Sequence, residues 1–110
     1  MVPRKGREPP DGAEPGVRVL GRETLSDFIK RHAAVRTQVA AWVAEAEEAV
    51  WKSPQDVRAR YPTVSFIRGN RAVFNLKGTK YRLDTTIAFN TGIVVVERMG
   101  THAEYTKWKF

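Results

Sequence analysis

The sequence lacks cysteine and any long hydrophobic run. The absence of cysteine excludes disulfide bonds and thiolate chemistry, and a small secreted domain would usually need such cross-links. Apolar runs such as Ile93 to Val96 are far shorter than the roughly 20 residues that cross a bilayer. Charged residues near the N-terminus stand where a signal peptide needs an apolar core. We therefore expect a cytoplasmic protein that does not associate with membranes.

Patterns typical of metal or cofactor sites are also missing. The chain has only two histidines, and its carboxylates show no spacing typical of metal ligands. We expect neither a metal nor a cofactor, so any chemistry would depend on the chain's own side chains.

Positive charge is abundant and unevenly distributed. The net charge is +7, and residues 53–110 hold ten basic but only four acidic residues. Such a field concentrates polyanions, which indicates nucleic acid or the ribosome as a partner. The alternative is a surface that serves solubility alone.

The chain is long enough for one domain. Residues 1–16 contain four prolines and three glycines and almost nothing apolar, which predicts a disordered leader. We expect the folded domain to span residues 17–110.

Helical spacing dominates the first part of this domain. A short strand at residues 17–20 precedes a helix of about ten residues that contains Leu25 and Phe28, and a longer helix follows to about residue 50. Ser53 and Pro54 predict the start of a third helix that ends near Arg60. Three residues on these helical stripes are assigned to the core: His32, Trp42 and Trp51.

Turn signals divide the remainder into four strands, at about residues 63–68, 71–77, 80–89 and 93–99. Short turns favour an antiparallel meander with one face covered by the two long helices. The fold class is therefore α+β. Ile93 to Val96 is apolar on both sides, which indicates a central strand or one flanked by a further segment.

Alternation along the strands predicts which side chains face away from the helices. Asn75, Lys77, Lys80 and Arg82 gather on this open face around one hairpin. The three cations among them repel one another unless an anion binds there, although a solvated polar face explains the pattern equally well. Thr101 is placed to cap a helical turn that would bring His102 and Tyr105 to one side.

Three motifs together resemble the HigB-type toxins, members of the RelE-like superfamily. They are Trp51 to Pro62, Asn70 to Leu83 and Gly100 to Tyr105, within a resemblance that extends in order from about Val19 to Tyr105. The resemblance implies N-terminal helices packed on one face of a twisted, mainly antiparallel sheet of four to five strands.

The resemblance also implies an activity and partners. Similar proteins are mRNA interferases that cleave mRNA, usually on the ribosome, and arrest translation and growth. A cognate antitoxin, expected to carry a helix-turn-helix, holds them inactive and binds operator DNA. The family's polar motif positions correspond here to Asn75, Lys80, Tyr81, Arg82, His102 and Tyr105.

Metal-free RNA cleavage needs a base, an acid and cations around the phosphate, and this requirement assigns roles. Arg82 is expected to stabilise the transition state, or else to pair with an acidic residue. His102 is expected to transfer a proton, since imidazole titrates near pH 6.5, or else to be part of a structural cap. Lys80 is interpreted as a phosphate contact rather than a base, and Tyr105 as a stacking or hydrogen-bonding residue or part of the core. The expected contacts to the RNA backbone are Arg68, Arg71, Asn75, Lys77 and Arg98, with solvated turn residues as the alternative for those in turns.

The chain departs from the family pattern at Asp84, at Glu97-Arg98 and in the tail Thr106 to Phe110. The two carboxylates would either orient Arg82 or Arg98 by pairing or weaken activity. A non-catalytic RNA- or ribosome-binding domain and a toxin that poisons DNA gyrase therefore remain alternatives on the same fold.

Overall fold

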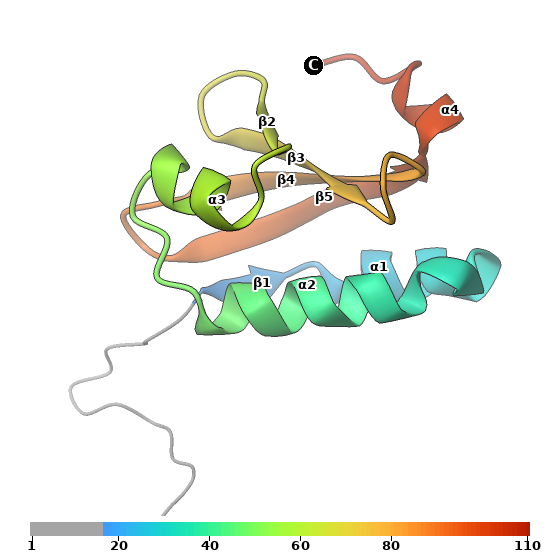
Figure 1. The fold of residues 1–110 in the computed structure, drawn as a ribbon, viewed down its shortest axis with the longest axis horizontal. Helices are drawn as coiled ribbons and strands as arrows, with labels where there is room; N and C mark the ends of the chain where they lie inside the picture. Colours follow the sequence, from blue (N-terminus) through green and yellow to red (C-terminus); the bar gives the residue numbers. More distant parts are fainter. Residues whose placement is uncertain (1–16) are drawn as a thin grey trace, which may run out of the picture.

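The structure is a computed structural model that describes residues 17–110. These residues form four α-helices, one turn of 3-10 helix and a five-stranded sheet (Figure 1). The leader expected at residues 1–16 lies outside the described residues. In the described part of the chain, no helix is both long enough and apolar enough to span a membrane.

The first elements follow the predicted order. β1 (Arg18–Leu20) leads into α1 (Arg22–Arg31), and the 3-10 turn η2 (Ala33–Val35) joins α1 to α2 (Arg36–Glu48). The short strand, the ten-residue helix and the longer helix are thus confirmed. The second helix ends just before Ala49, whose backbone is already extended.

The third helix starts where its capping residues predict. In α3 (Pro54–Arg60), the Ser53 hydroxyl accepts a hydrogen bond from the backbone N–H of Asp56 at 3.4 Å. The Asp56 carboxylate accepts from the backbone N–H of Lys52 at 2.9 Å. Two side-chain hydrogen bonds to backbone N–H groups thus stabilise the start of the helix. The helix stops before Pro62, which has no N–H to continue the ladder.

Five strands form one sheet in the order β1-β5-β4-β3-β2. The predicted antiparallel meander is confirmed in β2 (Ser65–Phe66), β3 (Arg71–Leu76), β4 (Tyr81–Ala88) and β5 (Ile93–Thr101). β1 adds to the other side of β5 in parallel. β5 therefore lies inside the sheet, which explains why its first half is apolar on both sides.

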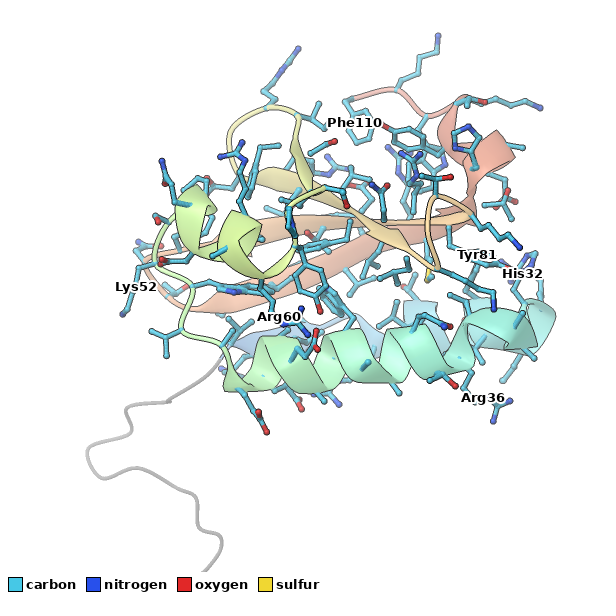
Figure 2. All side chains as sticks on the ribbon, in the orientation of Figure 1. His32, Arg36, Lys52, Arg60, Tyr81 and Phe110 are labelled. Carbon is cyan, nitrogen blue, oxygen red and sulfur yellow. The ribbon has the colours of Figure 1, made fainter. Side chains whose placement is uncertain are left out.

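The two faces of the sheet are covered unequally. α1 and α2 pack on one face, while α4 (His102–Tyr105) and the C-terminal end lie on the other (Figure 1). The core lies between the sheet and the two long helices and includes Trp42 and Trp51, as expected. His32 is only half-buried, at the edge of this core, where its ring stacks on Phe28 with centroids 4.3 Å apart (Figure 2).

Tyr61, directly after α3, connects this part of the chain to α2. Its hydroxyl donates a hydrogen bond to Glu45 on α2, and burial together with this bond raises the pKa of Tyr61 above the ordinary value of about 10.

The neutral phenol of Tyr61 therefore contributes stability below pH ~10, and this contribution is lost as the pH rises further. In an alkaline titration followed by phenolate absorbance, we expect Tyr61 to ionise only when the protein unfolds, above the ordinary range of a tyrosine. Tyr61→Phe should remove the late step. A titration curve in which Tyr61→Phe removes absorbance near pH ~10 instead of a late step would contradict the prediction.

Candidate functional site

Arg82, His102 and Tyr105 come together on the face of the sheet opposite α1 and α2. One guanidinium nitrogen of Arg82, Nη2, lies 3.1 Å from Nδ1 of His102. The Cζ atom of Arg82 lies 4.4 Å from the centroid of the Tyr105 ring. A planar cation is thus held against an imidazole and a phenol ring, and these three residues are called the Arg82–His102 site below.

A capping box at the end of β5 positions His102 and Tyr105. The Thr101 side chain accepts a hydrogen bond from the backbone N–H of Glu104 at 3.2 Å, and the Glu104 carboxylate accepts from the Thr101 N–H at 2.8 Å. The backbone N–H of His102 donates to the carbonyl oxygen of Lys80 at 2.9 Å. The predicted cap is confirmed. The hydrogen bond between His102 and Lys80 connects α4 to the turn between β3 and β4.

Gly100 allows the C-terminal residues to approach the sheet. It pairs with Arg82 across β5 and β4, and a Cβ atom at this position would lie 2.7 Å from the Trp108 ring. Any larger residue would force Trp108 to move. Close packing against Trp108 therefore explains why the third sequence motif has a glycine at this position.

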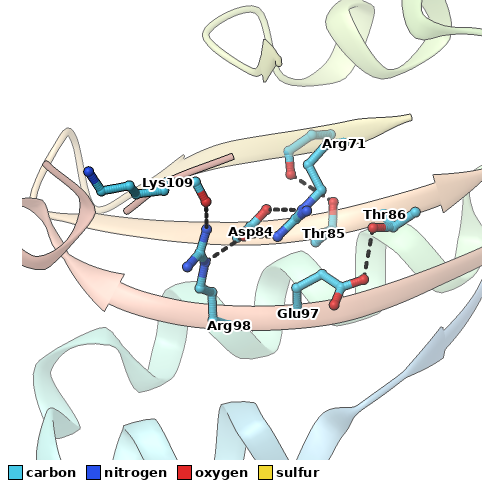
Figure 3. Close-up of polar contacts among 8 residues, drawn as sticks. Arg71, Asp84, Thr85, Thr86, Glu97, Arg98 and Lys109 are labelled. Atoms are coloured by element: carbon cyan, nitrogen blue, oxygen red, sulfur yellow. Dashed lines mark hydrogen bonds and ion pairs between the residues drawn. The ribbon is translucent and has the colours of Figure 1, made fainter. Parts of the chain in front are cut away.

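Arg82 differs from its neighbouring arginines because it has no acidic partner within residues 17–110. Arg71 and Arg98 both bind the carboxylate of Asp84, with nitrogen–oxygen distances of 2.7 Å (Figure 3). The hydrogen bond to Asp84 raises the pKa of Arg71. In contrast, Nε of Arg82 is buried without any hydrogen-bond partner. Since no carboxylate among the described residues neutralises it, the Arg82 guanidinium keeps its full charge for a ligand.

The open face is not bare along its whole length, which corrects the simple picture from alternation. Asp84 is 0% exposed, although it points away from the helices. Trp108 and Phe110 stack on Arg98, at 4.3 and 5.1 Å from its Cζ to their ring centroids. Sequence reasoning noted the unusual tail but missed this contact, whose only signal was the alternation of basic and aromatic residues in the last four positions.

The remaining predicted residues lie on the neighbouring strands and in the turns that join them. Lys80 and Lys77 lie in the exposed β3–β4 turn, and Lys77 has a left-handed backbone with φ of 55°. Asn75 pairs with Arg82 in the sheet and donates to the Thr63 carbonyl at 3.3 Å. Arg68 is exposed in the β2–β3 turn. Asp84 pairs with Arg98 as one alternative foresaw, and also with Arg71, but not with Arg82.

This arrangement is suited to binding a phosphate next to a proton acceptor. A guanidinium group has donors only, so its contact with Nδ1 of His102 is a hydrogen bond when that nitrogen carries no proton. A phosphate that takes over the Nη2 donor would release the lone pair of Nδ1 beside it. Among the residues that the structure describes, no group of three or more histidine or acidic side chains is placed to hold a metal ion.

Comparison with known proteins gives one family. The family model for the HigB toxin, a RelE-like toxic component of a toxin–antitoxin system, matches residues 35–108. The match includes every element from α2 to α4 and all residues of the Arg82–His102 site. The comparison with curated proteins gave no match.

Proposed function

The chain belongs to the HigB toxin family of RelE-like toxic components of toxin–antitoxin systems, and from this we propose that it is an endoribonuclease that cleaves mRNA. Membership of the family implies a cognate antitoxin as its partner. The proposed toxin domain spans residues 17–110. Its target is mRNA on the ribosome, in the cytoplasm, where cleavage would arrest translation and growth.

The observation that carries this proposal is the unpaired guanidinium of Arg82 beside the imidazole of His102. A phosphodiester has a negative charge that a planar, permanently charged fork can bind through two hydrogen bonds. A merely structural arginine would be expected to pair with a carboxylate, as Arg71 and Arg98 do on the same face.

In the proposed reaction, the 2′-oxygen of the ribose attacks the adjacent phosphorus. Nδ1 of His102 accepts the proton of the 2′-hydroxyl, and Arg82 binds the non-bridging oxygens as negative charge develops on them. The bond between phosphorus and the 5′-oxygen breaks, and the imidazolium returns the proton to that oxygen. The products are a 2′,3′-cyclic phosphate and a 5′-hydroxyl, so one proton moves and no water is consumed.

The residues around the site are assigned to substrate binding. Tyr105 holds the Arg82 guanidinium from one side, at 4.4 Å. Lys80 is joined to His102 through its backbone and presents an ammonium group from the adjacent turn as a phosphate contact. We propose that Asn75, Lys77 and Arg68 contact the RNA backbone. Arg71 and Arg98 contact it too, but with a charge that Asp84 partly neutralises. The positive charge of the chain's own side chains would make the reaction independent of metal ions.

Induced expression in bacteria tests the proposed function. We expect growth arrest with rapid fragmentation of mRNA, and rescue when the cognate antitoxin is produced at the same time. In the same proposal, the antitoxin carries a helix-turn-helix and links the toxin to operator DNA. Translation arrest with intact transcripts would indicate a non-catalytic binding domain, and a DNA-damage response would indicate gyrase poisoning; either result would overturn the proposed activity.

A further inference from the structure

A row of aromatic rings runs from the Arg82–His102 site along the open face. The centroid distances are 6.5 Å from His102 to Tyr105, 5.6 Å from Tyr105 to Trp108 and 6.5 Å from Trp108 to Phe110. These four residues are called the aromatic row below. The row is built by α4 and the last residues of the described chain, so it depends on the tail that departs from the family pattern.

Each ring after the histidine has a guanidinium group stacked against it. The Cζ atom of Arg82 lies 4.4 Å from the Tyr105 ring, that of Arg98 lies 4.3 Å from the Trp108 ring, and that of Arg71 lies 5.3 Å from the Phe110 ring. Alternating cations and aromatic rings are the pattern by which proteins bind single-stranded nucleic acid, with cations near the phosphates and rings under the bases.

The aromatic row ends at an open cavity. Its volume is about 220 Å³, and it is lined by Ile67, Arg68, Asn70, Arg71, Thr86 and Phe110. Pockets that enclose a drug-sized molecule measure roughly 300–1,000 Å³, so this cavity has room for a single ring system. The Phe110 side chain remains 41% exposed and offers one ring at the cavity wall.

We propose that this cavity is a subsite for a nucleobase of the RNA, stacked on Phe110. The inference rests on the proposed function, which it extends by adding a second contact to the same substrate. The Asn70 side chain offers both a donor and an acceptor to the edge of a base. Asp84 and its two partners Arg71 and Arg98, called the Asp84 network below, carry a net positive charge that together with Arg68 favours the phosphate that follows.

The position of the cavity defines which base it takes. Arg71 and Asn75 lie four residues apart on β3, which corresponds to about 13 Å at the usual rise of a strand. Asn75 is the register partner of Arg82, so the cavity lies at about this distance from the scissile phosphate. The base in the cavity is therefore not one that flanks the cleaved bond but one a few nucleotides away along the strand.

Mapping the cleavage sites of Phe110 variants tests the subsite. Each variant is expressed in full length in bacteria, and the new RNA 5′ ends are sequenced. We expect the parent to prefer one base, or one class of bases, at a fixed position a few nucleotides from the cut. Phe110→Ala and Phe110→Leu should lose that preference and cut the preferred sites roughly 5- to 100-fold more slowly, since base stacking on a ring has about this effect. Phe110→Tyr keeps the ring and should behave as the parent.

A matched control separates the ring's contact from a general effect. Leu20 is exposed to nearly the same extent, 42% against 41%, and lies on β1 at the opposite edge of the sheet, so Leu20→Ala should leave the cleavage pattern unchanged. If the parent cuts RNA but shows no preference beyond the nucleotides that flank the cut, or if Phe110→Ala keeps the preference, the subsite is wrong and the ribonuclease stands. If the parent does not cut RNA at all, the proposed function and the subsite both fall.

Discussion

Replacing Arg82 by alanine should reduce mRNA cleavage by about 10²–10³-fold, the loss typical when a group that stabilises transition-state charge is removed. Arg82 is the arginine of the open face without an acidic partner in residues 17–110, and its Nη2 contacts Nδ1 of His102. The measurement is the rate of transcript fragmentation after induction, together with the onset of growth arrest. Arg82→Lys should restore little, because an ammonium group keeps the charge but lacks the planar fork and its stacking on Tyr105.

The controls concern folding and charge. Arg36→Ala removes an arginine from α2, on the covered side of the sheet, and should keep full activity at the same net charge as Arg82→Ala (Figure 2). His102→Ala should lose about 10²–10⁴-fold, and the double variant little more, since residues that act as one unit are not additive. Thermal unfolding verifies that each variant folds. Fragmentation at the parent's rate in both Arg82→Ala and His102→Ala would overturn the site while leaving the family assignment intact.

Replacing Asp84 by alanine should destabilise the fold by about 3 kcal/mol, because removing one partner of a buried ion pair leaves uncompensated charge. Asp84 is completely buried and binds two guanidinium groups (Figure 3). The side chains of Arg71 and Arg98 are 31% and 33% exposed, so water can hydrate part of their charge and the loss stays at the lower end of the usual range. Urea denaturation gives the free energy of unfolding, and we expect the melting temperature to fall by roughly 10–20 °C.

Glu97 provides the matched control for this prediction. Glu97 is another acidic residue, on β5, but it is exposed. Its carboxylate accepts a hydrogen bond from the Thr86 hydroxyl at 2.8 Å. Glu97→Ala should cost less than about 1 kcal/mol, as expected of a single exposed hydrogen bond. An Asp84→Ala variant as stable as Glu97→Ala would show that the Asp84 network does not hold the open face together.

The helix boundaries and the meander were predictable because their signals are local. Ser53 and Pro54 start a helix through contacts within one turn, and Thr101 caps α4 through Glu104, three residues away. Alternation placed Arg82 on the face opposite the helices for the same reason, since neighbouring side chains in a strand point to opposite faces. The prediction that Arg82, His102 and Tyr105 meet depended on such local geometry together with the resemblance.

Partner choice was not predictable in the same way. Three arginines were possible partners for Asp84. It pairs with Arg98, which the strand register places opposite it, and with Arg71, which lies within reach on the next strand, but not with Arg82. The position of β1 beside β5 is likewise a contact between segments more than 70 residues apart in the chain. Spacing along the sequence has no information about such distances, which are decided by packing.

The sequence alone thus determined the secondary structure, the α+β class, the position of positive charge and the family resemblance, because each follows from neighbouring residues or from motifs in order. Only the tertiary structure decided that Asp84 pairs with two arginines and not with Arg82, and that Trp108 and Phe110 stack on Arg98 on the open face. The physical reason is that charge pairing and stacking depend on which surfaces the fold brings within a few ångströms of each other.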